Sequence, residues 1–135
     1  MASIFCQFVR PDKLLFQGDV AHLVLVTEAG ELGVWPAHAP EICALGDGVV
    51  RLQLLDEDGG GTVNIIVLGG YVEIGNDNVI VLADHARRSD DIEPDVVQET
   101  KDAAIAKRDA YPPGDHRRAY YDEKIRWCDL LLSHA

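Results

Sequence analysis

The run Glu31-Leu32-Gly33-Val34-Trp35-Pro36-Ala37-His38-Ala39-Pro40 is the most distinctive stretch of this chain. Within ten residues it holds a glycine, two prolines, a histidine and a tryptophan, and it lies between two apolar segments. Binding residues concentrate on loops that a rigid scaffold positions. We therefore expect this run to be a functional loop whose apolar residues form a docking edge.

The segments around this run predict β-strands. Residues 50–54 and 63–67 alternate apolar with polar side chains, which is the period of a strand with one solvated face. Asp58-Gly59-Gly60-Gly61 between them is a turn signal, and Gly69-Gly70 marks another. Short strands at roughly ten-residue spacing predict an antiparallel β-sandwich or barrel, which we assign to residues 1–85.

Residues 86–135 predict a helical hairpin. Glu93-Pro94-Asp95 favours a helix start, because proline tolerates the first turn and acids there complement the helix dipole. Pro112-Pro113-Gly114 ends this first helix, and Asp115 can cap a second one that runs to about Ser133. The second helix carries an apolar stripe, formed by Tyr121, Ile125, Cys128 and Leu132 and widened by Tyr120, Trp127 and Leu131.

The composition limits the classes of protein that this chain can be. Its 135 residues with 47% hydrophobic content fit one globular domain, or one domain with an appendage. No apolar run approaches the roughly 18 residues of a membrane span. Cys6, Cys43 and Cys128 are odd in number and far apart, which argues against a disulfide framework and for a reducing compartment.

The net charge of −11 is unevenly distributed. Residues 1–85 hold 3 basic and 12 acidic side chains, whereas residues 86–135 hold 9 basic and 11 acidic ones. A chain with this much negative charge binds nucleic acid poorly, because affinity for nucleic acid depends on neutralising its phosphates. The basic residues of the last third favour an acidic protein surface as their partner.

The sequence argues against an enzyme. It contains no G-x-S-x-G elbow, no Walker-type phosphate loop and no Rossmann fingerprint. Its histidines lack the paired spacing of metal ligands. Two alternatives stay open: a small metal-dependent β-sandwich enzyme that uses His22, His38 and His85, and a structural adaptor whose helices bind an unrelated acidic partner.

Several landmarks in order resemble the epsilon subunit of F-type ATP synthases over nearly the whole chain. They are Phe16-Gln17-Gly18, the run from Gly30 to Pro40, Gly48-Val49-Val50-Arg51, Gly69-Gly70-Tyr71-Val72-Glu73 and Asn78-Val79-Ile80-Val81-Leu82-Ala83-Asp84. The resemblance implies a noncatalytic rotor subunit that binds the gamma subunit and the ring of membrane c subunits. It implies a β-sandwich followed by a helical hairpin.

The same resemblance assigns roles to particular residues. The ring-facing interface would comprise Glu31, Leu32, Gly33, Val34, Trp35, Pro36 and His38. The hairpin would extend and suppress ATP hydrolysis through transient contact with the catalytic beta subunit. Its basic residues for that contact would be Arg117, Arg118, Lys124 and Arg126.

One departure concerns ATP. Some members of the family bind ATP through an Ile/Leu-Asp-x-x-Arg-Ala motif, but here the aligned run is Ile92-Glu93-Pro94-Asp95-Val96-Val97. Glu93 replaces the aspartate, and Val96 replaces an arginine that could pair with phosphate. We therefore expect weak or no ATP binding, and no other cofactor.

The resemblance also implies a location. No secretory signal or transit peptide is visible in the sequence. We therefore expect a peripheral protein on the cytoplasmic face of a bacterial inner membrane, attached only through its complex. A chloroplast thylakoid is the alternative.

Overall fold

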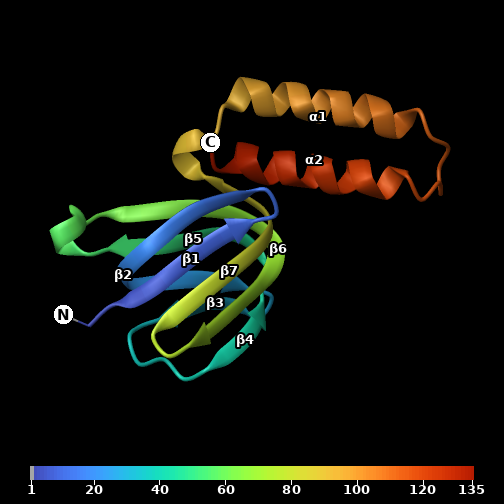
Figure 1. Cartoon of the computed structure of the whole chain (residues 1–135). Helices are drawn as coiled ribbons and strands as arrows, with labels where there is room; N and C mark the ends of the chain where they lie inside the picture. The colour runs from blue at the N-terminus through green and yellow to red at the C-terminus, as the bar shows by residue number, and fades with distance from the viewer. Residues whose placement is uncertain (1) are drawn as a thin grey trace. The chain divides into compact units, whose positions relative to one another are not determined.

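The computed structural model describes residues 2–135 and divides the chain into two compact units, one ending at Asp90 and the other spanning Asp91–Ala135 (Figure 1). No helix among these residues is long and apolar enough to cross a membrane. The first unit is built from strands, with a short 3-10 turn at Asp56–Asp58 and another, Ser89–Asp91, at its end. The strands are β1 (Ile4–Arg10), β2 (Lys13–Thr27), β3 (Gly30–Val34), β4 (Glu41–Ala44), β5 (Asp47–Leu54), β6 (Thr62–Gly75) and β7 (Asn78–Arg88).

The strands confirm the predicted β-sandwich. Hydrogen-bonded neighbours follow the order β1-β7-β6-β5-β2-β3, and β1 also pairs with β2, so five strands close on themselves. β3 extends the sheet from β2, and β4 pairs with β6. Every pairing is antiparallel except that of β1 with β7.

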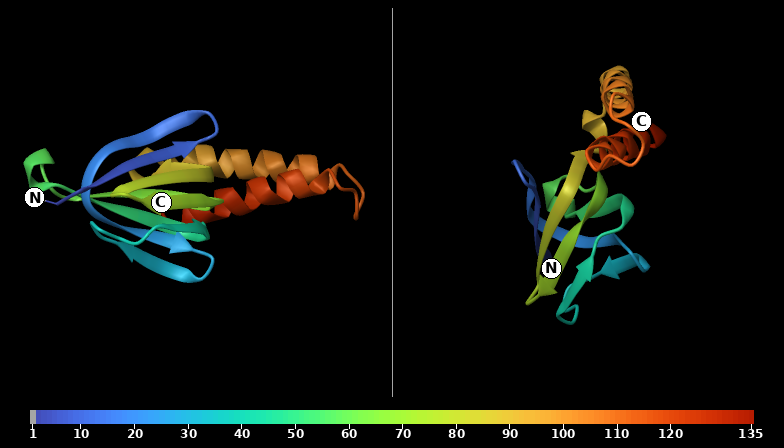
Figure 2. Two further views of the ribbon diagram at one scale, coloured as in Figure 1. Left: turned by 60° about the horizontal axis from the view of Figure 1, so that its bottom comes forward. Right: turned by 90° about the vertical axis from the view of Figure 1, so that its right-hand side faces the viewer.

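The long strand β6 passes from one layer of the sandwich to the other (Figure 2). Its first half, Thr62–Leu68, pairs with β5, and its second half, Tyr71–Ile74, pairs with β4. Gly69 and Gly70 lie between the halves with φ of 73° and 124°. A Cβ on Gly70 would collide with the Leu82 carbonyl oxygen of β7, so only glycine permits this close approach.

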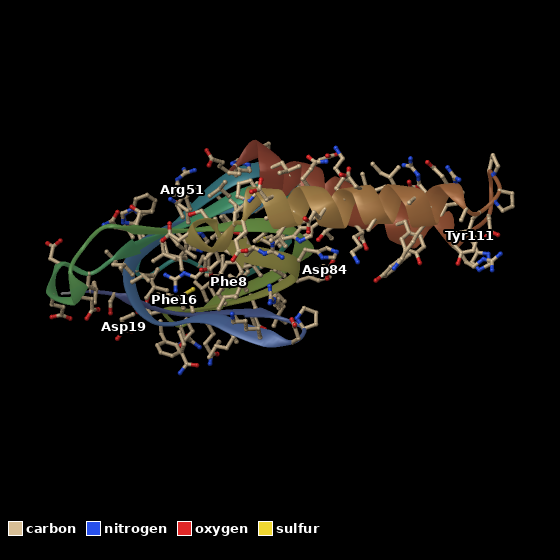
Figure 3. The ribbon with its side chains drawn as sticks, turned by 90° about the horizontal axis from the view of Figure 1, so that it is seen from above. Phe8, Phe16, Asp19, Arg51, Asp84 and Tyr111 are labelled. Carbon is tan, nitrogen blue, oxygen red and sulfur yellow. The ribbon has the colours of Figure 1, made fainter. Side chains whose placement is uncertain are left out.

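The core lies between the two layers, because alternate side chains of each strand point inward. Ile4, Cys6 and Phe8 of β1 are almost completely buried, as are Val50 and Leu52 of β5. Each fully buried side chain of this size contributes roughly 1.5–3 kcal/mol. Phe8 is paired across the strands with Phe16 of β2, which packs at the margin of the same core (Figure 3).

The structure places the end of the β-unit later than residue 85. β7 continues to Arg88, because Ala86 is buried and pairs with Val67. Arg87 and Arg88 continue the ladder opposite Ile66 and Ile65. In the sequence, the charged side chains of residues 87–91 predict a linker, so the last residues of this strand were not assigned to it.

The second unit is the helical hairpin, formed by α1 (Pro94–Asp109) and α2 (Arg118–Ser133). The helices run antiparallel side by side (Figure 1). α1 begins at the predicted proline and buries Val97 and Ala104. α2 buries Trp127, Cys128 and Leu131, which belong to the predicted apolar stripe.

Ion pairs connect the helices, and the two shortest lie along their length. Lys101 Nζ lies 2.6 Å from an Asp129 carboxylate oxygen, and Arg108 lies 3.1 Å from that of Asp122. The hydrogen bond to Asp129 raises the pKa of Lys101. Because the carboxylates are largely exposed, each pair contributes at most about 1 kcal/mol.

We expect Gly70→Ala to lower the free energy of unfolding by about 2–4 kcal/mol, since the new methyl group collides with β7 and the backbone is strained. Gly61→Ala is the matched control, because Gly61 has φ of 79° but open space around its Cβ position. It should cost only about 1–2 kcal/mol. Urea denaturation measures both values, and equal losses would contradict the close-approach explanation.

Candidate partner-binding surfaces

The distinctive run folds as strand β3 followed by a turn, so its side chains alternate between two faces. Val34 is completely buried in the core, and Leu32 packs against the same core from a half-buried position. Glu31, Gly33 and Trp35 lie on the outer face. Val34 therefore cannot contact a partner, which corrects the predicted interface, and Leu32 has little surface to offer.

Trp35 is the main exposed aromatic of this region. Its indole ring stacks on the His22 imidazole of β2, with ring centroids 4.6 Å apart and planes within 5°. The same indole covers Gly33, where a Cβ would lie 2.5 Å from the ring. Although 54% exposed, the tryptophan is thus held in one orientation, as expected of an anchor at an interface.

Glu31 already has a partner within the chain. Its carboxylate lies 2.9 Å from the Arg51 guanidinium of β5 (Figure 3 labels Arg51). Both side chains are substantially exposed, so the pair contributes at most about 1 kcal/mol. A basic group of a partner would have to compete with Arg51 for Glu31.

The turn after β3 is fixed by hydrogen bonds. The His38 amide donates to the Trp35 carbonyl at 3.2 Å, and His38 Nδ1 lies 2.7 Å from the Ala39 carbonyl. Ala37 has φ of 69°, a left-handed conformation that costs a non-glycine residue about 1–2 kcal/mol. Its amide donates to the Asp77 carboxylate at 2.6 Å. Pro36 is half-buried within this turn.

A second surface was missed by the sequence reasoning. Paired residues of five neighbouring strands form a line across the outer face of the other layer, which we call the apolar row. Leu14, Leu82 and Tyr71 in this row are 52–65% exposed. The complete row is Leu14, Val9, Leu82, Tyr71 and Ala44.

The apolar row has further apolar and polar neighbours. Ile42, one pleat along β4, is 74% exposed. A depression of about 210 Å³ lies beside the row, lined in part by Pro11, Arg10 and Asp84. The Arg10 guanidinium donates hydrogen bonds to the Asp12 carboxylate at 3.0 Å and to the Ala86 carbonyl at 2.9 Å. In the sequence, each of these strands shows only an alternating pattern, which predicts a solvated outer face. The apolar side chains form a row only because the register of the strands aligns them.

The turn of the hairpin engages two of the four predicted basic residues. Arg117 binds Asp115 with two hydrogen bonds, at 2.6 and 3.0 Å, and lies over the Tyr111 ring at 4.3 Å (Figure 3 labels Tyr111). Arg118 donates to the carbonyls of Arg108 and Tyr111 at 3.0 and 2.8 Å. Arg108 lies in the last turn of α1 and Tyr111 lies two residues beyond its end, so Arg118 caps the C-terminal end of that helix.

The other predicted hairpin positions lie along the helices. Lys124 is half-buried and Arg126 is exposed, both on α2. Glu93 is the N-cap residue of α1, and its side chain makes no capping hydrogen bond. Ile92 is half-buried and Val96 is 50% exposed. Val96 therefore presents an apolar side chain and no cation at this position.

The structure does not bring His22, His38 and His85 together as a metal site. In the part of the chain that the structure describes, no group of three His, Cys, Asp or Glu side chains could hold a metal ion. The His22 ring stacks on the Trp35 ring, and His38 lies in the turn after β3. The cysteines of the described residues form no disulfide, and burial raises the pKa of Cys6 to about 12.

Comparison with known sequences gives a consistent family. Residues 3–89 match the family described as ATP synthase, delta/epsilon chain, beta-sandwich domain. The chain is 34% identical over 98 residues to the chloroplastic ATP synthase epsilon chain of Cucumis sativus, which covers 73% of this chain and 71% of the relative. The corresponding protein of Lotus japonicus is 33% identical with the same coverage.

Solved structures share the fold. A chain of the Euglena gracilis mitochondrial ATP synthase structure, which contains OSCP, F1 and the c-ring, matches with a TM-score of 0.72 and 21% identity. It covers 98% of this chain and 81% of its own length. A chain of the Tetrahymena thermophila central stalk and c-ring structure has a TM-score of 0.55 and 11% identity, covering 96% and 93%.

We expect the Asp115–Arg117 pair to make the hairpin turn sensitive to acid. Hydrogen bonds from the Arg117 side chain and amide lower the pKa of Asp115 from 3.8 to about 2. Because the folded pKa is depressed, the contribution to stability is complete above about pH 4 and is lost as the pH falls toward 2. Carboxyl titration by NMR should give a midpoint near 2 for Asp115.

Arg117→Gln provides the control for this titration. It removes the charged donor but keeps the amide of residue 117, so the Asp115 midpoint should move up toward 3.8. An unchanged midpoint would show that Arg117 does not cause the depressed pKa.

Proposed function

Because the chain belongs to the ATP synthase delta/epsilon chain family, we propose that its β-sandwich joins the gamma subunit to the ring of c subunits in the central stalk. An epsilon chain is a stalk subunit and not the catalytic one. The chain therefore acts through the surfaces that it offers to other subunits.

The apolar row is the observation that carries the gamma contact. Contiguous exposed apolar side chains on a soluble domain mark interaction sites. Leu82 and Tyr71 are paired neighbours at the middle of the row, and Ile42 adds to it from β4. The surface is backed by the rigid sandwich, so binding requires little ordering of the backbone.

The ring-facing edge is assigned to the outer residues around β3. Trp35 supplies a fixed aromatic surface, with Pro36 and His38 beside it in the turn. Glu31 supplies a carboxylate that exchanges between Arg51 and basic groups of the ring. An exposed pair of this kind is worth at most about 1 kcal/mol, so it orients the contact more than it strengthens it.

The hairpin is assigned the regulation of ATP hydrolysis. In the folded hairpin, Arg117 and Arg118 are engaged at the turn, whereas an extended chain would expose both to an acidic segment of the beta subunit. Lys124 and Arg126 lie farther along α2 and would join that contact. The same arginines therefore stabilise the folded state and serve the inhibitory one, so the two states compete.

ATP does not enter this regulation in our proposal, because Val96 provides no cation for phosphate. The protein would be peripheral to its membrane through the complex. The chloroplastic names of its relatives support the thylakoid as the alternative to a bacterial inner membrane.

Leu82→Glu should abolish binding to purified gamma subunit, or weaken it at least about tenfold, because a charge enters the centre of the apolar row. The exposed position should tolerate the change without loss of the fold. Thr62→Glu adds the same charge at an exposed residue of β6 outside the row and should leave the affinity unchanged. Titration calorimetry measures both. Equal affinities for the two variants would contradict the assignment.

Reconstitution of the catalytic complex tests the role of the hairpin. ATP hydrolysis should be lower with the full chain than with a chain truncated after Asp90, since only the former carries the hairpin. Both forms must first be shown to bind equally. Equal activity with both bound would exclude regulation by the hairpin, and binding of neither would contradict the stalk assignment itself.

A further inference from the structure

We propose that Asp77 is a positioning residue that holds the Trp35–His38 turn in its docking shape before any partner binds. Asp77 lies 40 residues away in the chain, in the turn between β6 and β7. The use of this shape for the c-ring rests on the function proposed above. The positioning itself does not, because it concerns contacts within the sandwich.

The turn after β3 needs an external hold. Ala37 lies in the left-handed region with φ of 69°, where the Cβ of an alanine is unfavourable. Only one backbone hydrogen bond, from His38 to Trp35 at 3.2 Å, closes the turn from within. A strained residue persists only where its surroundings determine its conformation.

Asp77 supplies this external contact, and its own backbone is anchored in the sandwich. Its carboxylate accepts the Ala37 amide at 2.6 Å, and its own carbonyl accepts the amide of Phe5 in β1 at 2.9 Å. Asn76 and Asp77 have φ of 51° and 56°, as in the tight two-residue hairpins that favour Asn, Asp and Gly. Asp77 therefore ties the turn to two further segments of the sandwich.

Beneath the turn, the chain is packed against the core of the sandwich. The space between the turn and the β6–β7 hairpin is lined by Ile4, Val34 and Val79, among others, and has no room for a water molecule. The hydrogen bond itself is exposed, so solvent water satisfies the Ala37 amide when the carboxylate is removed but does not fix the position of the turn. Without the carboxylate, the turn would move outward more readily and take the Trp35 backbone with it.

The consequence is preorganisation of the docking edge. A loop that is ordered beforehand does not lose conformational entropy on binding, so the affinity is higher for the same contacts. Trp35 is held at its ring by His22 and at its carbonyl by the turn. Asp77 thus acts on the partner through Trp35 and His38 without needing to touch it.

The test compares variants of the full chain that separate the carboxylate from the backbone conformation. Asp77→Gly removes the acceptor but tolerates the positive φ, so exchange of the Ala37 amide hydrogen should become about tenfold faster. Asp77→Asn retains an acceptor oxygen and should change the rate less than about threefold. Asn76→Gly makes a similar change at the neighbouring positive φ and should leave the rate unchanged.

Binding to the complex that contains the c-ring gives the second measurement. Asp77→Gly should weaken it about three- to tenfold, and Asp77→Asn should not. Adding Ala37→Gly to Asp77→Gly should recover part of the affinity, because glycine adopts the turn conformation without strain. This recovery separates positioning from a general loss of stability.

Each outcome decides one of the two proposals. Unchanged exchange at Ala37 in Asp77→Gly, or equal acceleration in Asn76→Gly, would overturn the positioning role. Unaltered binding by Asp77→Gly, despite faster exchange, would overturn its importance for docking. If the unsubstituted chain does not bind the ring, the proposed function fails, while the exchange rates still decide the role of Asp77.

Discussion

The close approach of β6 to β7 at Gly70 is the constraint on which the rest of the sandwich depends. At this point β6 stops pairing with β5 and starts pairing with β4, while it stays paired with β7. A side chain at Gly70 would push the Leu82 carbonyl away and separate the strands. The apolar row depends on the same register, because Tyr71 follows Gly70 directly and faces Leu82 across the ladder.

The alternation of strand side chains decides how little of the distinctive run is available to partners. Val34 fills the core, and Trp35, the next residue, lies outside on His22. One structural element thus fastens the run to the sandwich and presents its aromatic surface. The tie from Ala37 to Asp77 extends this arrangement into the turn, so the edge proposed to face the ring is part of the rigid domain and not a free loop.

The hairpin uses its charges differently from the sandwich. Lys101 and Arg108 join the helices, and Arg118 closes the end of α1. Arg117 is neutralised by Asp115, which keeps that carboxylate charged to low pH. Four of the basic residues of this segment, Lys101, Arg108, Arg117 and Arg118, are therefore already engaged within the folded hairpin. A partner that needs these arginines must gain more from them than the hairpin loses.

The amino-acid sequence alone was enough to predict the two units, the strand-rich first part, the helix start at Pro94 and much of the apolar stripe of α2. These features follow from periodicity and from helix and turn signals among near neighbours in the chain. Local reasoning also singled out Trp35 and Arg117 but could not tell what they contact. Only the tertiary structure buried Val34, extended β7 to Arg88, aligned the apolar row and placed Asp77 against Ala37. Those outcomes depend on register and closure between strands far apart in the chain, and a one-residue shift in pairing would reverse the face of every side chain.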